Sequence, residues 1–242
     1  MMNLQQRLPP RARRFAKKAL HYGLARGCPI CTSTVRRFGE FGVEARPNAS
    51  CPICGSLERH RLAWLFLQQR TDIFDRRPKR LLHFAPEGSF AQRLQRVEGL
   101  HYLSADLAAA NAMVRLDIGR LPVRDSYFDA VYCSHVLEHV CDDRAAMREV
   151  CRVVKSDGWV IFQVPISVER TLEDPAVTDP QERLHLFGQE DHVRRYGADF
   201  VERLRESGFA AREVTGAELV EARRLEHFAL ADESLFFCVP AG

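Results

Sequence analysis

The chain has 242 residues, of which 46% are hydrophobic, so it can form one large domain or a medium domain with a small attachment. Its formal net charge of +3 at pH 7 is too small to indicate nucleic-acid binding by itself. No apolar stretch is long enough to cross a bilayer, and the N-terminus lacks the apolar core of a signal peptide. These features favour a cytoplasmic protein whose thiols are reduced or bound to metal.

Positive charge is concentrated in a basic N-terminal segment, residues 1–26. Up to Arg37 the chain has nine lysines and arginines and no carboxylate. Such a run is suited to RNA, to phosphate groups or to peripheral contact with an anionic membrane surface. The simpler interpretation, a solvated basic helix, is favoured over these partners.

Two short cysteine pairs follow, in the sequences CPIC and CPICGS, with nineteen residues between them. Each pair places two thiolates on one tight turn, and two such turns complete a tetrahedral four-sulfur site. The spacing predicts a zinc ribbon over residues 27–56 with a closed, structural metal site. Iron is the alternative metal, because C-P-x-C-G turns resemble those of rubredoxin. The predicted ligands are Cys28, Cys31, Cys51 and Cys54.

A linking helix is expected over residues 57–78, with Ser56 as its cap. Arg59, His60 and Arg61 stand in its first turn, where they either contact an anionic ligand or are solvated. The four cysteines outside the pairs are expected to be small core residues. They are Cys133, Cys141, Cys151 and Cys238.

From Lys79 the chain alternates apolar runs with helical patterns, which predicts a mostly parallel sheet covered by helices. The expected strands are 80–85, 101–106, 112–117, 128–134, 158–165 and 234–240. The expected helices are 89–97, 139–155 and 198–209. In such sheets, ligands bind at the carboxyl ends of the strands.

The first of these strands runs into a loop where nucleotide-binding folds normally have several glycines, but here only Gly88 is a glycine. The second strand ends at Asp106, an acid at the offset suited to accept both ribose hydroxyls of a nucleoside. The third strand ends at Asp117.

The region from Asp117 resembles the class I S-adenosylmethionine-dependent methyltransferases, especially the small-molecule group. The resemblance is carried by Asp117, Leu121–Pro122, Ser126–Val140 and Arg148–Pro165. The segment Arg152–Gly158 is similar to the family's turn before its fifth strand. The resemblance implies a seven-stranded, mostly parallel sheet of Rossmann-like type over residues 79–242, with S-adenosylmethionine as cofactor.

By the same resemblance, Asp106 holds the adenosyl ribose, Asp117 lies against the adenine amino group, and Ser134 and His135 lie near the methyl group. The first loop departs from the family's acidic, glycine-rich pattern, and Glu87 is expected to bind the methionine amino group or the substrate. The implied cofactor contacts are His83, Ala85, Pro86, Glu87, Gly88, Asp106, Leu107, Asp117, Ile118 and Ser134.

The sequence HVLEH, from His135 to His139, matches a zinc-protease pattern. We reject that interpretation because His135 directly follows a strand, and we expect Glu138 and His139 to begin a helix. Residues 166–197 are long for a connection and are expected to form a lid over the substrate. The candidate bases are His135, His185 and His192, in that order.

The predicted reaction is methyl transfer to a small molecule or glycan, most simply O-methylation. The asparagine- or aspartate-proline-proline-aromatic motif of base N-methyltransferases is absent after the fourth strand, where CSHVLEH stands. One alternative is an RNA methyltransferase that uses the ribbon and the basic segment. The other is a non-catalytic docking protein with a methyltransferase fold.

Overall fold

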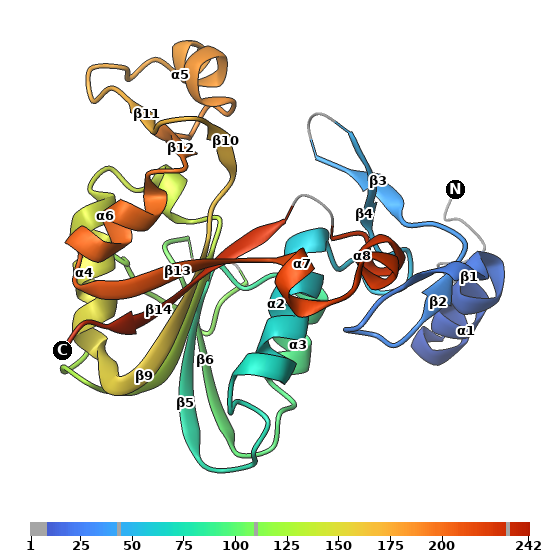
Figure 1. The fold of residues 1–242 in the computed structure, drawn as a ribbon. Coiled ribbons are helices and arrows are strands. Elements are labelled where there is room, and N and C mark those ends of the chain that lie inside the picture. Colours follow the sequence, from blue (N-terminus) through green and yellow to red (C-terminus); the bar gives the residue numbers. More distant parts are fainter. Residues whose placement is uncertain (1–8, 43–44, 109–110, 231–232) are drawn as a thin grey trace. The chain divides into compact units, whose positions relative to one another are not determined.

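The computed structural model describes residues 9–42, 45–108, 111–230 and 233–242, so Arg7 of the basic segment lies outside the described residues. The chain forms two compact units (Figure 1). The first comprises residues 1–72, 88–93 and 215–234, and the second comprises residues 73–87, 94–214 and 235–242. The sequence predicts residues 88–93 and 215–234 inside the domain 79–242.

The second unit is built on a seven-stranded sheet (Figure 1). In spatial order the strands are β13 (Phe209–Thr215), β14 (Ser234–Pro240), β9 (Val154–Gln163), β8 (Phe128–Ser134), β5 (Lys79–Phe84), β6 (Leu100–Asp106) and β7 (Val114–Arg115). The neighbours from β9 to β7 pair in parallel, and β14 pairs antiparallel with β9. The predicted seven-stranded, mostly parallel sheet is therefore confirmed.

The sheet reverses its direction of growth at β5. The chain passes from β5 outward to β6 and β7, then returns to the other side of β5 as β8 and β9. Connections therefore leave the carboxyl ends of β5 and β8 in opposite directions. A crevice forms at such a switch point, and ligands of open α/β sheets bind there.

One face of the sheet is covered by α4 (Asp143–Val153) and α6 (Phe200–Glu206). The helix α4 buries Ala146, Met147, Val150 and Val153, which recur at helical spacing. They share one core with alternate strand residues, such as Val131 and Cys133 of β8, and with Phe200 and Leu204 of α6. This core holds the strand ends in fixed positions.

The connection after β9 has a small fold of its own (Figure 1). It contains β10 (Ile166–Val168), β11 (Leu172–Glu173), α5 (Pro180–Phe187) and β12 (Arg194–Gly197). Buried Arg194 joins this region to the loop after β8, because it donates to the carbonyls of Leu137 and Cys141 at 2.8 Å and also to that of Val140. The expected lid is thus a packed substructure.

The first unit contains short strands and helices. They are α1 (Pro10–His21), β1 (Tyr22–Gly27), β2 (Thr34–Val35), β3 (Gly39–Phe41), β4 (Arg46–Ser50), α2 (Glu58–Arg70), α7 (Gly216–Leu219) and α8 (Ala222–Phe228), with most of α3 (Gly88–Leu94). Phe90 stacks on His60 and meets Trp64 edge-on, which explains why α3 groups with α2.

Arg61 organises the first unit from its interior. Its side chain is fully buried, and its guanidinium donates to the carbonyls of Ala49, Ser56 and Phe228, among others. Its charge lies 4.2 Å above the Phe38 ring. Arg61 was expected to contact a ligand or to be solvated, and it does neither. Its guanidinium carries five N–H donors, so it can satisfy several backbone carbonyls at once inside the unit.

Several local predictions need correction. Cys141 is exposed, whereas Cys133 and Cys238 are buried. Ser56 does not cap α2, because its hydroxyl contacts the cysteine sulfurs and the Leu57 N–H bonds to His60 instead. Glu138 and His139 belong to a 3-10 turn, η2 (Leu137–His139), and the helix begins only at Asp143. Among the described helices, none is both long and apolar enough to cross a membrane.

Candidate functional site

A pocket of about 560 Å³ opens at the carboxyl ends of β5, β6 and β8, at the switch point of the sheet. Its size is that of a small-molecule site. It is lined by Phe84, Ala85, Ala105, Asp106, Leu107, Ala108, Arg115, Leu116, Asp117, Ile118, His135, Val136, His139, Val140 and Asp191. The predicted residues Asp106, Leu107, Asp117, Ile118, Ala85 and His135 therefore share one pocket.

Two carboxylates of the pocket are held by their own turns. Asp106 accepts a hydrogen bond from the Ala108 N–H at 2.7 Å, and Asp117 accepts one from the Gly119 N–H at 2.8 Å. Each carboxylate is thus oriented by the backbone two residues later, as aspartates are in turns of this kind. Leu107 and Ile118 place apolar surface next to these carboxylates. Together, the two carboxylates and the apolar side chains suit a ligand that has hydroxyl groups and a flat apolar ring.

The loop after β5 contributes Ala85 to the pocket. Ala85 has φ of 48°, in the left-handed region that favours glycine, and its N–H bonds to the Ala105 carbonyl at 2.9 Å. Pro86, Glu87 and Gly88 follow it without lining the pocket. A small residue at position 85 leaves the backbone accessible to a ligand.

His83 lies beneath the pocket and does not line it. Its ring is 1% exposed, its Nδ1 pairs with the Tyr102 hydroxyl at 2.8 Å, and it meets Tyr132 edge-on. The structure therefore does not bring His83 together with the predicted cofactor contacts that line the pocket. Ser134 is likewise buried outside the pocket lining, at 2% exposure.

His135 stands at the mouth of the pocket, directly after β8. Its φ of 53° turns the chain sharply out of the strand. Its Nδ1 lies 3.0 Å from Oε1 of Glu138, whose side chain is 1% exposed. Burial acts to raise the pKa of Glu138, but the interactions with His135 outweigh it, so the pKa is lowered and the group is anionic.

The other two predicted bases occupy different environments. His185 is exposed on α5 and does not line the pocket. His192 is 5% exposed, and its ring packs edge-on against His139 with centroids 4.7 Å apart. Burial lowers the pKa of His192, which favours the neutral ring. His139 and Asp191, which the sequence analysis did not select, also line the pocket and lie 3.1 Å apart.

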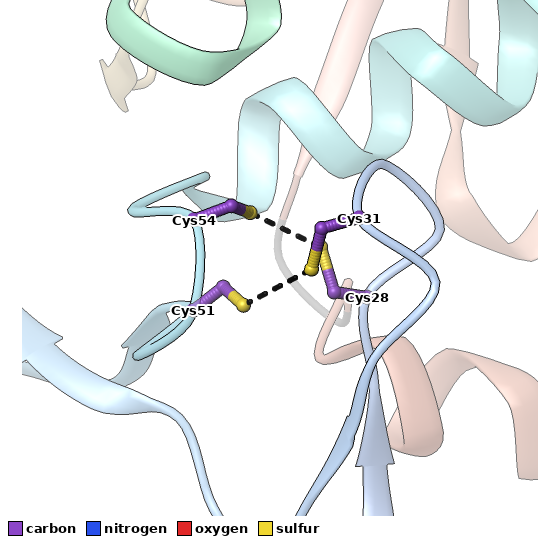
Figure 2. Close-up of side chains that lie close together, drawn as sticks. All are labelled: Cys28, Cys31, Cys51 and Cys54. Carbon is purple, nitrogen blue, oxygen red and sulfur yellow. Dashed lines mark hydrogen bonds between the residues drawn. The ribbon is translucent and has the colours of Figure 1, made fainter. Parts of the chain in front are cut away.

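The four paired cysteines meet in the first unit (Figure 2). The Cys28 and Cys54 sulfurs are 3.6 Å apart, and those of Cys31 and Cys51 are 3.8 Å apart. A disulfide requires about 2.05 Å, so these thiols are not bonded to one another. A tetrahedron with metal–sulfur bonds of about 2.3 Å has edges of roughly 3.8 Å, so the cluster has the dimensions of a zinc site.

A serine supports this cluster. The Ser56 hydroxyl lies 3.1 Å from the Cys28 sulfur and 3.2 Å from that of Cys54. Three of the four cysteines are buried, and Gly55, directly after Cys54, has φ of 75°, in the left-handed region that favours glycine. The local geometry is thus that of a closed, four-sulfur site.

Comparison with known proteins supplies the family context. Residues 87–162 match a family model described as a methyltransferase domain. This segment, less than a third of the chain, is therefore similar to a methyltransferase domain. The matched segment runs from the loop after β5 to β9 and contains Asp106, Asp117 and His135.

The curated relatives match over short stretches. The chain is 46% identical over 39 residues to a ubiquinone biosynthesis O-methyltransferase of Nitrosomonas europaea, which is 16% of this chain and 17% of that protein. It is 34% identical over 74 residues to the uncharacterized methyltransferase YcgJ of Bacillus subtilis, 31% of this chain and 28% of that protein. The chain thus spans less than a third of the length of each of these relatives.

Among solved structures, an S-adenosylmethionine-dependent methyltransferase of Mesorhizobium loti is similar, with 17% identity and a TM-score of 0.47. The match covers 73% of this chain and 96% of that one. The fold assignment rests on the strand order described above.

Proposed function

We propose that this protein transfers a methyl group from S-adenosylmethionine to a hydroxyl oxygen of a small molecule or glycan. The observation that carries the proposal is the joint position of Asp106 and Asp117 in one pocket at the switch point of the sheet. The match of residues 87–162 to a methyltransferase domain supports it independently.

The pocket residues fit the adenosyl group. In the proposal, Asp106 accepts hydrogen bonds from the two ribose hydroxyls, and Asp117 accepts one from the adenine amino group. Ile118 and Leu107 pack against the ring, and the backbone at Ala85 approaches the amino-acid part. When bound, S-adenosylmethionine supplies a sulfonium methyl group that bonds to the acceptor oxygen as its carbon–sulfur bond breaks.

His135 is the proposed general base. Its Nδ1 faces Glu138, so Nε2 is the nitrogen left to take the proton from the acceptor hydroxyl. The buried carboxylate would stabilise the imidazolium that forms, as the third member of a catalytic triad does. Neither His185, which is exposed, nor His192, which is buried beside His139, has an equivalent position at the pocket.

We further propose that Cys28, Cys31, Cys51 and Cys54 hold a structural zinc ion in the first unit. The sulfur separations and the burial of the cluster support this assignment. A four-thiolate site leaves no open coordination position, so its contribution is to folding.

The ligand preference of the pocket tests the proposal. We expect S-adenosylhomocysteine at about 100 times its Kd to stabilise the protein by roughly 2.7 kcal/mol, which raises Tm by about 5–10 °C. The dinucleotide NAD at the same concentration should leave Tm unchanged, because the loop after β5 lacks the glycines that receive a pyrophosphate. Thermal unfolding with each ligand measures these shifts in Tm. Adenosine, the nucleoside that both ligands contain, is the control.

An equal stabilisation by NAD would contradict the assignment of the pocket to a methyl donor. The absence of any shift with S-adenosylhomocysteine, in protein that unfolds cooperatively, would favour the non-catalytic docking protein.

A further inference from the structure

A second cluster of metal-binding side chains lies in the second unit, beside the pocket. One ligand atom from each of Glu138, His139 and His192 lies within 4.8 Å of the other two. None of these residues belongs to the cysteine site. Two histidines and one carboxylate, with further positions open, form a common ligand set for catalytic divalent metals.

Glu138 presents a buried charge that is only partly compensated, by His135. Its side chain is 1% exposed, and neither carboxylate oxygen has a hydrogen-bond partner of acceptable geometry among the described residues. His135 Nδ1 approaches Oε1 at 3.0 Å, and no hydrogen-bond donor of the described residues reaches Oε2. An ionised carboxylate buried in this way is costly unless it is paired or bound to a metal.

The imidazole ring of His192 has the hydrogen bonding that is typical of a histidine ligand of a metal. Its Nδ1 lies 3.3 Å from the Phe187 carbonyl, so this nitrogen carries the proton and the lone pair is on Nε2. The Nε2 atom is buried and has no hydrogen-bond partner among the described residues. A backbone carbonyl on the distal nitrogen is the usual support of a histidine that binds metal through the other.

The cluster is preorganised by the backbone around it. The Val193 N–H donates to the Glu138 carbonyl at 2.9 Å, and this bond ties the segment that carries His192 to η2. Asp191 contacts Nδ1 of His139 at 3.1 Å, as an outer carboxylate that orients a histidine ligand does. His139 and His192 are 53 residues apart in the sequence, but these contacts hold their two segments together.

We propose that Glu138, His139 and His192 bind one first-row divalent cation at the edge of the donor pocket. His139 and Asp191 also line that pocket, so the cation would stand beside the acceptor. The role of the cation rests on the proposed function. The cation would bind the acceptor oxygen and lower the pKa of the acceptor hydroxyl, as metals do for bound water. Its binding does not depend on that role.

Cobalt binding tests the site in protein whose four cysteines are already saturated with zinc. Co²⁺ accepts nitrogen and oxygen ligands, and its absorption spectrum distinguishes these from thiolates. Replacement of zinc by cobalt at the cysteine site would therefore be detected. We expect the wild type to bind one Co²⁺ per chain in a calorimetric titration, without thiolate charge-transfer absorption.

Substitutions locate the bound cobalt. Glu138→Gln and His139→Asn should each weaken Co²⁺ binding at least tenfold, and His101→Asn, on the exposed amino end of β6, should not. His139 is partly exposed, so its variant keeps the test valid if Glu138→Gln does not fold. No binding by the wild type, thiolate absorption alone, or unchanged affinity in folded variants would overturn the proposal.

The donor pocket is tested separately in the same preparations. S-adenosylhomocysteine should bind the folded His139→Asn protein, because Asp106 and Asp117 are intact. Cobalt binding without S-adenosylhomocysteine binding would sink the proposed methyl transfer and leave the cation site standing. The reverse result would remove only the cation site.

Discussion

The Cys51→Ser variant is expected to lose its zinc and the ordered structure of its cysteine region. Cys51 is 1% exposed and belongs to the four-sulfur cluster, and the strands around it have between two and six residues. Strand pairs of this size are at most marginally stable alone. A structural zinc site contributes about 10–16 kcal/mol of binding energy to folding, so its loss should dominate local stability.

Metal analysis and limited proteolysis measure this effect. After a wash with a weak chelator, we expect one zinc per wild-type chain and none per Cys51→Ser chain. Rapid cleavage should appear within residues 22–55, whereas the seven-stranded sheet of the second unit resists. Cys141→Ser is the matched control, because Cys141 is exposed and outside the cluster. A Cys51→Ser protein with one retained zinc and unchanged protease resistance would contradict the assignment.

The Asp106→Ala variant is expected to bind S-adenosylhomocysteine about 100-fold more weakly than the wild type. A hydrogen bond to a charged group contributes about 1.5–3 kcal/mol, and Asp106 is proposed to accept two from the ribose. A loss of roughly 3 kcal/mol corresponds to about two orders of magnitude in Kd. The variant also loses the bond that holds the turn at Ala108.

Calorimetric titration of folded protein measures the two affinities. Asp157→Ala is the matched control, because Asp157 is exposed near the amino end of β9, away from the pocket lining. Affinity within twofold of the wild type in the Asp106 variant would show that this carboxylate does not hold the ligand.

The sequence was most informative where one physical requirement selects the residues. Alternating apolar runs predicted the sheet because a buried parallel strand must be apolar along its whole length. Paired cysteines at short spacing predicted the four-sulfur cluster because few other arrangements keep four thiols close together. The resemblance to the methyltransferase family implied that Asp106 and Asp117 lie at one cofactor site, and both line one pocket because parallel strands end at one edge of the sheet.

Predictions were wrong where burial depends on contacts between distant segments. Arg61 was expected at a ligand or in solvent, but its partners include Phe228, which is 167 residues away. The cofactor contact of His83 stays a prediction, but its ring meets Tyr102 and Tyr132 of neighbouring strands edge-on and does not line the pocket. Cys141 was expected to be a small core residue but is exposed.

The cluster of Glu138, His139 and His192 likewise depends on contacts between distant segments. The pattern HVLEH drew attention to the first two, but a regular helix was expected there, and a 3-10 turn forms instead. His192 was selected as a candidate base in a lid, and the spacing of residues in that segment gave little support for a second metal. Its partners become apparent once β12 and Arg194 bring the two segments together.

Hydrogen exchange with and without saturating S-adenosylhomocysteine tests most directly the claim that the donor pocket lies at the switch point of the sheet. We predict slower exchange in the segments that end β5, β6 and β7 and in the turn after β8, near residues 84–86, 105–108, 115–118 and 135–140. Exchange in the cysteine region should be unchanged. Protection confined to the first unit, or no protection at a ligand concentration that saturates binding, would contradict the account.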